Sequence, residues 1–150
     1  HAATSQGVRA AEHACGLDVP ENESLVPGVI FTSPEVATVG MSETEAKEQG
    51  LDVNIGTFPF KSLGRAVAAN ETEGFVKWIT DKNTGQLIGA QAVGPDATDL
   101  IAEAGVAVRG EFTAHELGSV IHAHPTFNEA WMEAAHAVDN EAIHQPPAKK

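Results

Sequence analysis

Two apolar segments separated by a polar turn constrain the fold of this chain more than any other feature. Residues 75–81 and 86–93 are rich in β-branched, aromatic and small apolar side chains, and they flank the run Asp81-Lys82-Asn83-Thr84-Gly85. A short polar turn that ends in glycine between two such segments is typical of a β-hairpin. The middle of the chain is therefore predicted to form antiparallel strands.

Other segments extend this pattern on both sides of the hairpin. Alternating or β-rich residues predict further strands at 29–32, 36–39, 52–59 and 65–70. The dipeptide Ser33-Pro34 predicts an edge or a bend, because proline cannot donate a ladder hydrogen bond. Helical spacing and capping residues predict helices over 1–16, 42–50, 95–110, a short segment from 113, and 126–138. Strands in the middle with helices after them indicate an α+β domain, with an antiparallel sheet of about five strands and helices packed on one face.

Composition excludes several classes of function. The net charge is −12, with nine Lys and Arg against 21 Asp and Glu, so binding to nucleic acid or to anionic lipid is not expected. No apolar run approaches the roughly 20 residues of a membrane span, and no signal peptide is recognisable. Cys15 is the single cysteine. It can form no internal disulfide, which fits a reducing compartment, so a cytoplasmic location is predicted.

The richest segment for chemistry is the run from Ile121 to Trp131, which contains His124-Pro125 and then Glu129. Histidine exchanges protons near neutral pH, and a nearby carboxylate orients its ring and raises its basicity. An X-Pro bond can be cis at modest cost, which can aim the preceding side chain. We therefore predict His124 as a general acid/base and Glu129 as its orienting partner.

Three other interpretations of these residues stay open. Thr126-x-x-Glu129 also fits a capping box, in which the carboxylate binds a backbone N–H, and Pro125 also fits the first position of a helix. In addition, His122-x-His124 is a spacing that binds metals from a strand, with Glu129 or His136 as a further ligand. Because most histidines are ordinary polar residues, no metal site is predicted.

Taken together, three stretches resemble the C-terminal dimerisation domain of the pyridine nucleotide-disulfide oxidoreductases, the flavin-dependent disulfide reductases. The 121–131 run resembles that family's C-terminal signature. The segment from Val29 to Gly40 is similar as well, and so are the motifs between Leu63 and Pro95. Within the family, the likeness is greatest to the dihydrolipoamide dehydrogenases. It implies residues 1–23 as a helix and linker left from a preceding FAD-binding domain, 24–140 as the dimerisation domain, and 141–150 as a disordered tail.

The resemblance also implies a function. Such a domain forms a homodimer and supplies a His–Glu pair, here His124 and Glu129, for the NAD-dependent oxidation of dihydrolipoyl groups through FAD and a redox disulfide located elsewhere. It implies a cis bond at Pro125, with the backbone near His124 touching the partner subunit's flavin, and a lipoyl-bearing acyltransferase as partner. The isolated chain is expected to be inactive and to bind no FAD tightly. The alternatives are a glutathione or mercuric reductase-like relative, or a non-catalytic dimerisation module.

Overall fold

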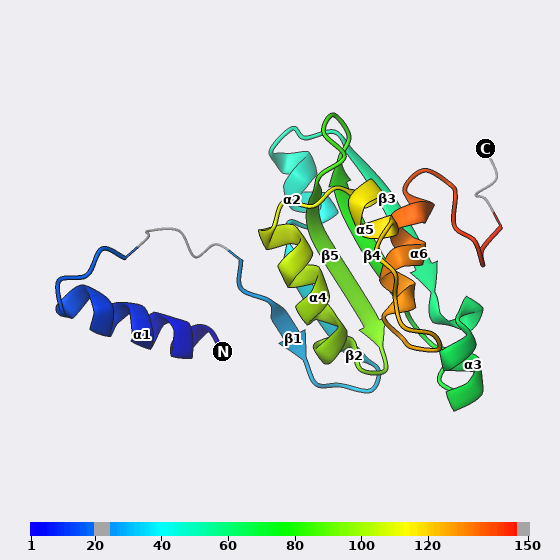
Figure 1. Ribbon diagram of the computed structural model, residues 1–150, viewed down its shortest axis with the longest axis horizontal. Coiled ribbons are helices and arrows are strands. Elements are labelled where there is room, and N and C mark those ends of the chain that lie inside the picture. Colours follow the sequence, from blue (N-terminus) through cyan, green and yellow to red (C-terminus); the bar gives the residue numbers. More distant parts are fainter. Residues whose placement is uncertain (20–24, 147–150) are drawn as a thin grey trace.

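A five-stranded antiparallel sheet forms the centre of the molecule. The computed structural model describes residues 1–19 and 25–146. The strand order is β1-β2-β5-β4-β3 (Figure 1). The strands are β1 (Gly28–Ile30), β2 (Glu35–Gly40), β3 (Val53–Pro59), β4 (Phe75–Asp81) and β5 (Leu87–Gly94). The α+β class, the predicted hairpin and the number of strands are confirmed, and the Ser33-Pro34 bond, which is cis, lies between β1 and β2 at one edge.

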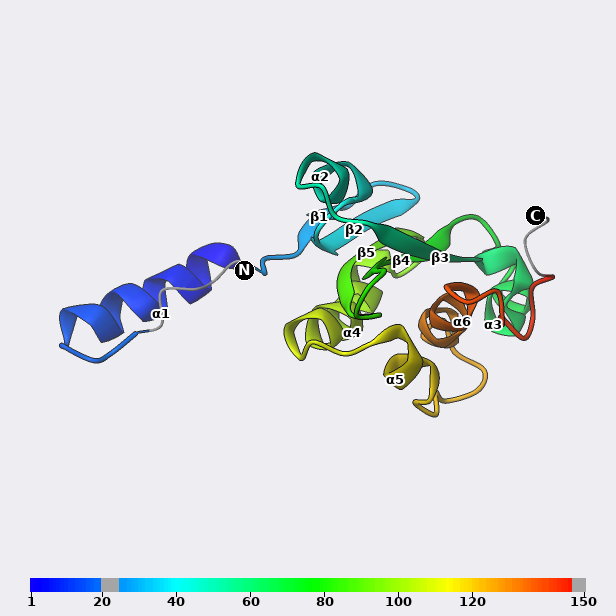
Figure 2. The same cartoon turned by 90° about the horizontal axis from the view of Figure 1, so that it is seen from above.

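Helices cover mainly one face of this sheet. The helical elements of the described residues are α1 (Ala2–Ala14), α2 (Glu43–Glu48), the 3-10 turn η1 (Phe60–Ser62), α3 (Gly64–Ala69), α4 (Ala97–Arg109), α5 (Ala114–Gly118) and α6 (Glu129–Ala137). α4 packs on β2 and β5, and α6 packs on β3 and β4. Figure 2 shows α4, α5 and α6 on one side of the sheet and the short α2 on the other. The capping residues that predicted the helices from 42 and from 113 form capping boxes, Ser42 with Glu45 and Thr113 with Glu116.

One predicted strand is wrong. Residues 65–70 belong largely to helix α3, which ends at Asn70 in the left-handed conformation with φ of 58°. Alanine is the strongest helix former, and asparagine tolerates the left-handed position that ends a helix. The alanines of this segment therefore outweigh its weak strand pattern.

Helix α6 approaches the sheet closely because small residues surround Trp78 at the centre of β4. Trp78 is fully buried and pairs with Gly56 on β3 and Ala90 on β5. A Cβ atom at Gly56 would overlap the backbone carbonyl of Ala134 and the side chain of Val138. The missing side chain at Gly56 thus allows α6 to lie directly against β3.

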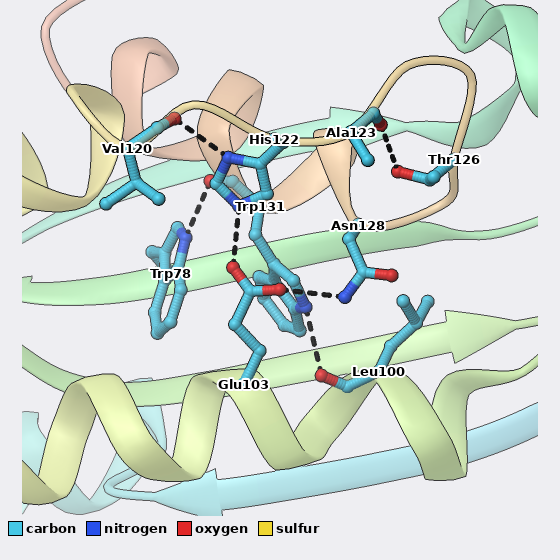
Figure 3. A network of polar contacts seen from close by, with 9 residues as sticks. All are labelled: Trp78, Leu100, Glu103, Val120, His122, Ala123, Thr126, Asn128 and Trp131. Atoms are coloured by element: carbon cyan, nitrogen blue, oxygen red, sulfur yellow. Dashed lines mark hydrogen bonds and ion pairs between the residues drawn. The ribbon is translucent and has the colours of Figure 1, made fainter.

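Two tryptophans join the sheet to both covering helices. The rings of Trp78 and Trp131 have centroids 4.7 Å apart. Trp78 Nε1 donates to the Trp131 carbonyl at 3.0 Å, and Trp131 Nε1 donates to the Leu100 carbonyl at 3.1 Å (Figure 3). Buried indole N–H groups need such acceptors. The two bonds fix α6 between β4 and α4.

The N-terminal helix differs from the rest because none of its residues is buried. It lies beside the sheet domain rather than on it (Figure 1). Residues 20–24 of the predicted linker and residues 147–150 of the predicted tail lie outside the described residues. Within the described part of the chain, none of the helices has the length and apolar character needed to cross a membrane.

Candidate active site

The predicted catalytic residues lie in an irregular segment, residues 119–128, between α5 and α6. The His124-Pro125 peptide bond is cis. Helix α6 begins at Glu129 rather than at Thr126. The turn that leads into it has backbone hydrogen bonds that span three residues, from Ala130 N to Phe127 O and from Trp131 N to Asn128 O. Pro125 is therefore not the first residue of a helix, and the helix-start interpretation is wrong.

His124 and Glu129 contact each other directly. Nδ1 of His124 lies 2.8 Å from Oε1 of Glu129. The histidine side chain is 75% exposed, whereas the glutamate side chain is only 15% exposed. The ring edge with Nε2 thus faces outward while the carboxylate supports the ring from within. This geometry suits an imidazole that exchanges a proton with a molecule outside the domain.

The second oxygen of Glu129 makes half of the alternative capping interaction. Oε2 accepts a hydrogen bond from the backbone N–H of Thr126 at 2.8 Å. The reciprocal bond is replaced, because Thr126 Oγ1 donates to the Ala123 carbonyl at 2.7 Å. Glu129 therefore contacts the His124 ring with one oxygen and the Thr126 N–H with the other, while the complete capping box is not formed.

The environment of Glu129 favours its ionised form. Burial raises the pKa of this carboxyl group, but the hydrogen bonds from Thr126 N–H and from His124 lower it by more, so the pKa lies below its usual value. Its position at the start of α6 adds the favourable field of a helix N-terminus. An ionised carboxylate at Nδ1 stabilises the imidazolium that forms when His124 takes up a proton.

The His-x-His spacing does not gather metal ligands. His122 turns toward α4 and His124 turns toward Glu129. Among the residues that the structure describes, no group of three or more His, Cys, Asp or Glu side chains is placed to hold a metal ion. Cys15, in the turn after α1, is exposed and free.

The sequence did not identify one polar group beside the site. Glu103, in the middle of α4, accepts hydrogen bonds from the His122 ring and from Asn128 Nδ2, each at 2.7 Å (Figure 3). One signal was available. Glu103 is spaced by three and four residues from Leu100 and Ala107, which are both buried, and a charged group near a buried helix face needs a partner.

Comparison with known proteins gives a consistent result. The family model described as the pyridine nucleotide-disulphide oxidoreductase dimerisation domain matches residues 26–135. The chain is 46% identical over 145 residues to the dihydrolipoyl dehydrogenase of Bacillus subtilis, covering 96% of this chain and 31% of that protein. The chain thus spans about a third of the length of the curated relatives it matches.

Two solved structures share the fold. LpdA from Mycobacterium tuberculosis matches with a TM-score of 0.77 and 30% identity, over 85% of this chain and 28% of that one. The HOCl-induced flavoprotein disulfide reductase RclA from Escherichia coli matches with a TM-score of 0.76 and 26% identity, over 83% of this chain and 29% of that one.

Proposed function

The chain belongs to the pyridine nucleotide-disulphide oxidoreductase family, whose dimerisation domain it contains, and from this premise we propose that it is the interface domain of a dihydrolipoyl dehydrogenase. In the complete enzyme it forms the homodimer and provides His124 and Glu129 for the oxidation of dihydrolipoyl groups. The observation that supports this most is the exposed imidazole held at 2.8 Å by a mostly buried carboxylate.

The proposed role of His124 follows from the chemistry of thiols. A thiol has a pKa of about 8.5, and the thiolate is the nucleophile. Nε2 of His124 takes the proton of a dihydrolipoyl thiol, so that the sulfur can attack a disulfide. Nδ1–H meanwhile donates to Glu129, which stabilises the positive ring. Such general-base assistance contributes about 10²–10⁴-fold in rate.

The cofactors would be bound by other parts of the enzyme. Within the described residues, the single sheet is antiparallel, and no parallel doubly wound sheet of the kind that holds dinucleotides is present. His124 and Pro125 are both exposed, so they are available to lie against the flavin of a partner subunit. When bound there, FAD would accept electrons from a reduced redox disulfide and pass them to NAD⁺. With one cysteine in this chain, that disulfide would also lie elsewhere.

Exposed apolar side chains near the site support a subunit interface. Val106, Phe112, Val120 and Ile121 are all exposed, and Ile121 is exposed by 96%. They line a groove of about 510 Å³ together with His122. Apolar patches of this kind mark interaction surfaces. We therefore propose a homodimer through this region, with a lipoyl-bearing acyltransferase as the partner complex and the cytoplasm as its location.

The test is His124→Gln in the complete enzyme. We expect the turnover number kcat for dihydrolipoamide oxidation to fall by about 10²–10⁴-fold. Reduction of ferricyanide by NADH should stay within about twofold, because it requires no thiol deprotonation. Unchanged dihydrolipoamide oxidation would contradict the proposed role. The isolated chain should lack both activities and bind no FAD tightly, and sedimentation should show a dimer.

A second candidate is another flavin disulfide reductase, which the likeness to RclA favours. The same fold and His–Glu pair would serve a different thiol or disulfide substrate. The ratio of kcat/KM for dihydrolipoamide to that for glutathione separates the two. A ratio in favour of glutathione would reject the dihydrolipoyl assignment.

A further inference from the structure

A second His–Glu pair lies beside the proposed catalytic pair and is built differently. Nε2 of His122 lies 2.7 Å from Oε1 of Glu103, and the His122 side chain is only 6% exposed, against 75% for His124. The two histidines are separated by one residue, yet one faces the protein and the other faces outward. This contrast indicates that they have different roles.

Glu103 binds the segment on both sides of His124. Oε1 contacts His122, two residues before His124, and Oε2 accepts from Asn128 Nδ2, four residues after it (Figure 3). Between these points the chain forms neither helix nor strand. Side-chain contacts must therefore determine where the segment lies, and a single carboxylate holds its two ends.

The partners of His122 define its protonation state. Nδ1 lies 3.0 Å from the Val120 carbonyl oxygen, which can only accept, so Nδ1 must bear a hydrogen. Oε2 of Glu103 accepts from Asn128, and Oε1 of the same carboxylate faces Nε2 at 2.7 Å, a contact in which a carboxylate accepts and Nε2 donates. Both ring nitrogens are thus donors, which is the imidazolium form. A ring held in this form cannot act as a base.

The support for Glu103 is rigid. Helix α4 packs against β2 and β5, and Trp131 Nε1 donates to the carbonyl of Leu100, one turn before Glu103. Trp131 belongs to α6, which begins with Glu129. The carboxylate that holds the segment and the carboxylate that orients His124 are therefore fixed relative to each other through one buried indole.

We propose that Glu103 is a positioning residue for His124: its carboxylate fixes the 122–128 segment through the His122 ring and through Asn128, and His122 takes no part in proton transfer. This inference rests on the proposed function of His124. It adds three residues to those that serve the site, Glu103, His122 and Asn128, of which Glu103 comes from a helix remote in sequence.

The first test uses Glu103→Gln and His122→Gln in the complete enzyme. Displacement of a catalytic group by about 1 Å can cost on the order of 10²-fold, so we expect kcat for dihydrolipoamide to fall by about ten- to a hundredfold. The Michaelis constant and the NADH–ferricyanide activity should each stay within about twofold. Because both variants break the same Glu103–His122 contact, the double variant should be about as slow as either variant alone.

A matched control is Glu35→Gln. The Glu35 carboxylate on β2 also accepts two hydrogen bonds at α4, from the backbone N–H and the hydroxyl of Thr98, but it does not touch the 122–128 segment. We expect kcat within about twofold of the unmodified enzyme. Full dihydrolipoamide activity in Glu103→Gln, or an equal loss in Glu35→Gln, would overturn the positioning role.

The second test needs no catalysis and uses the 150-residue chain. Nitrogen-15 NMR of the imidazoles should show His122 with both nitrogens protonated at neutral pH, and Glu103→Gln should remove that state and broaden the His124 signals. A neutral His122, or unaltered His124 signals in Glu103→Gln, would refute the positioning role of Glu103. If His124→Gln retained full activity, the proposed function would fail. The NMR measurement would still show whether Glu103 holds the 122–128 segment.

Discussion

His124 is exposed over three-quarters of its side chain, while Glu129, its partner at 2.8 Å, is largely shielded from solvent. An exposed base alone would be positioned poorly, because its side chain could adopt several rotamers. The shielded carboxylate removes that freedom on one edge of the ring and leaves the other edge available. The pair therefore combines access with orientation.

Replacement of Glu129 by Gln tests this arrangement. An amide keeps an acceptor for the Thr126 N–H but loses the negative charge beside the ring. We expect kcat for dihydrolipoamide in the complete enzyme to fall by about ten- to a hundredfold, within the range of acid–base assistance. The urea midpoint of the chain should change little. The matched control is Glu116→Gln, which alters the same kind of contact to Thr113, the residue before α5, and should leave kcat unchanged. Equal losses in both variants would reject the orienting role.

The stability of the chain should depend on pH through His122. The hydrogen bond with Glu103 raises the pKa of His122 above its usual 6.5, despite the opposing effect of burial. Because the folded state binds this proton more tightly, the contribution is complete below about 6.5 and is lost as the pH rises through the folded-state pKa. The stability difference between the unmodified chain and His122→Gln should therefore be larger at about pH 6 than at about pH 9. Urea unfolding measures it, with the exposed His115→Gln as control. A difference that grows with pH would contradict the ion pair.

Gly56→Ala tests the close contact between β3 and α6. The added Cβ would overlap the Ala134 carbonyl and Val138, so α6 must shift. Overpacking of this kind costs about 1–3 kcal/mol in the free energy of unfolding. Gly64→Ala is the control, because nothing lies near a Cβ at that position, the first residue of α3. Comparable losses in both variants would show that packing against α6 is not the cause.

The segment after α6 should depend on Glu133. This carboxylate is 1% exposed and accepts from the backbone N–H groups of Ile143 and His144 and contacts the His144 ring. Glu133→Gln leaves a buried N–H donor facing other donors, which costs about 1–3 kcal/mol. Hydrogen exchange at the Ile143 amide should accelerate, whereas the exposed Glu141→Gln should not change it. Unaltered exchange in Glu133→Gln would show that the segment is held by other contacts.

The sequence predicted those parts of the fold and site that depend on residues near one another. The hairpin follows from a turn between two apolar segments, and the His124–Glu129 contact joins residues five positions apart. The Glu103–His122 contact spans 19 positions. It arises only after α4 packs on the sheet, so no local pattern revealed the partner. The start of α6 was misplaced because Thr126 donates to Ala123 instead of capping the helix.

The two indole hydrogen bonds have a consequence for how this domain tolerates change. Both acceptors, at Trp131 and Leu100, are main-chain carbonyls, which every amino acid provides. Amino-acid substitutions at Leu100 or at other positions of α4 and α6 therefore leave the acceptors in place. Loss of the Trp131 indole removes the bond from α6 to α4, and loss of the Trp78 indole removes the bond from β4 to α6. The spacing between the two site carboxylates is therefore sensitive to mutation at either tryptophan.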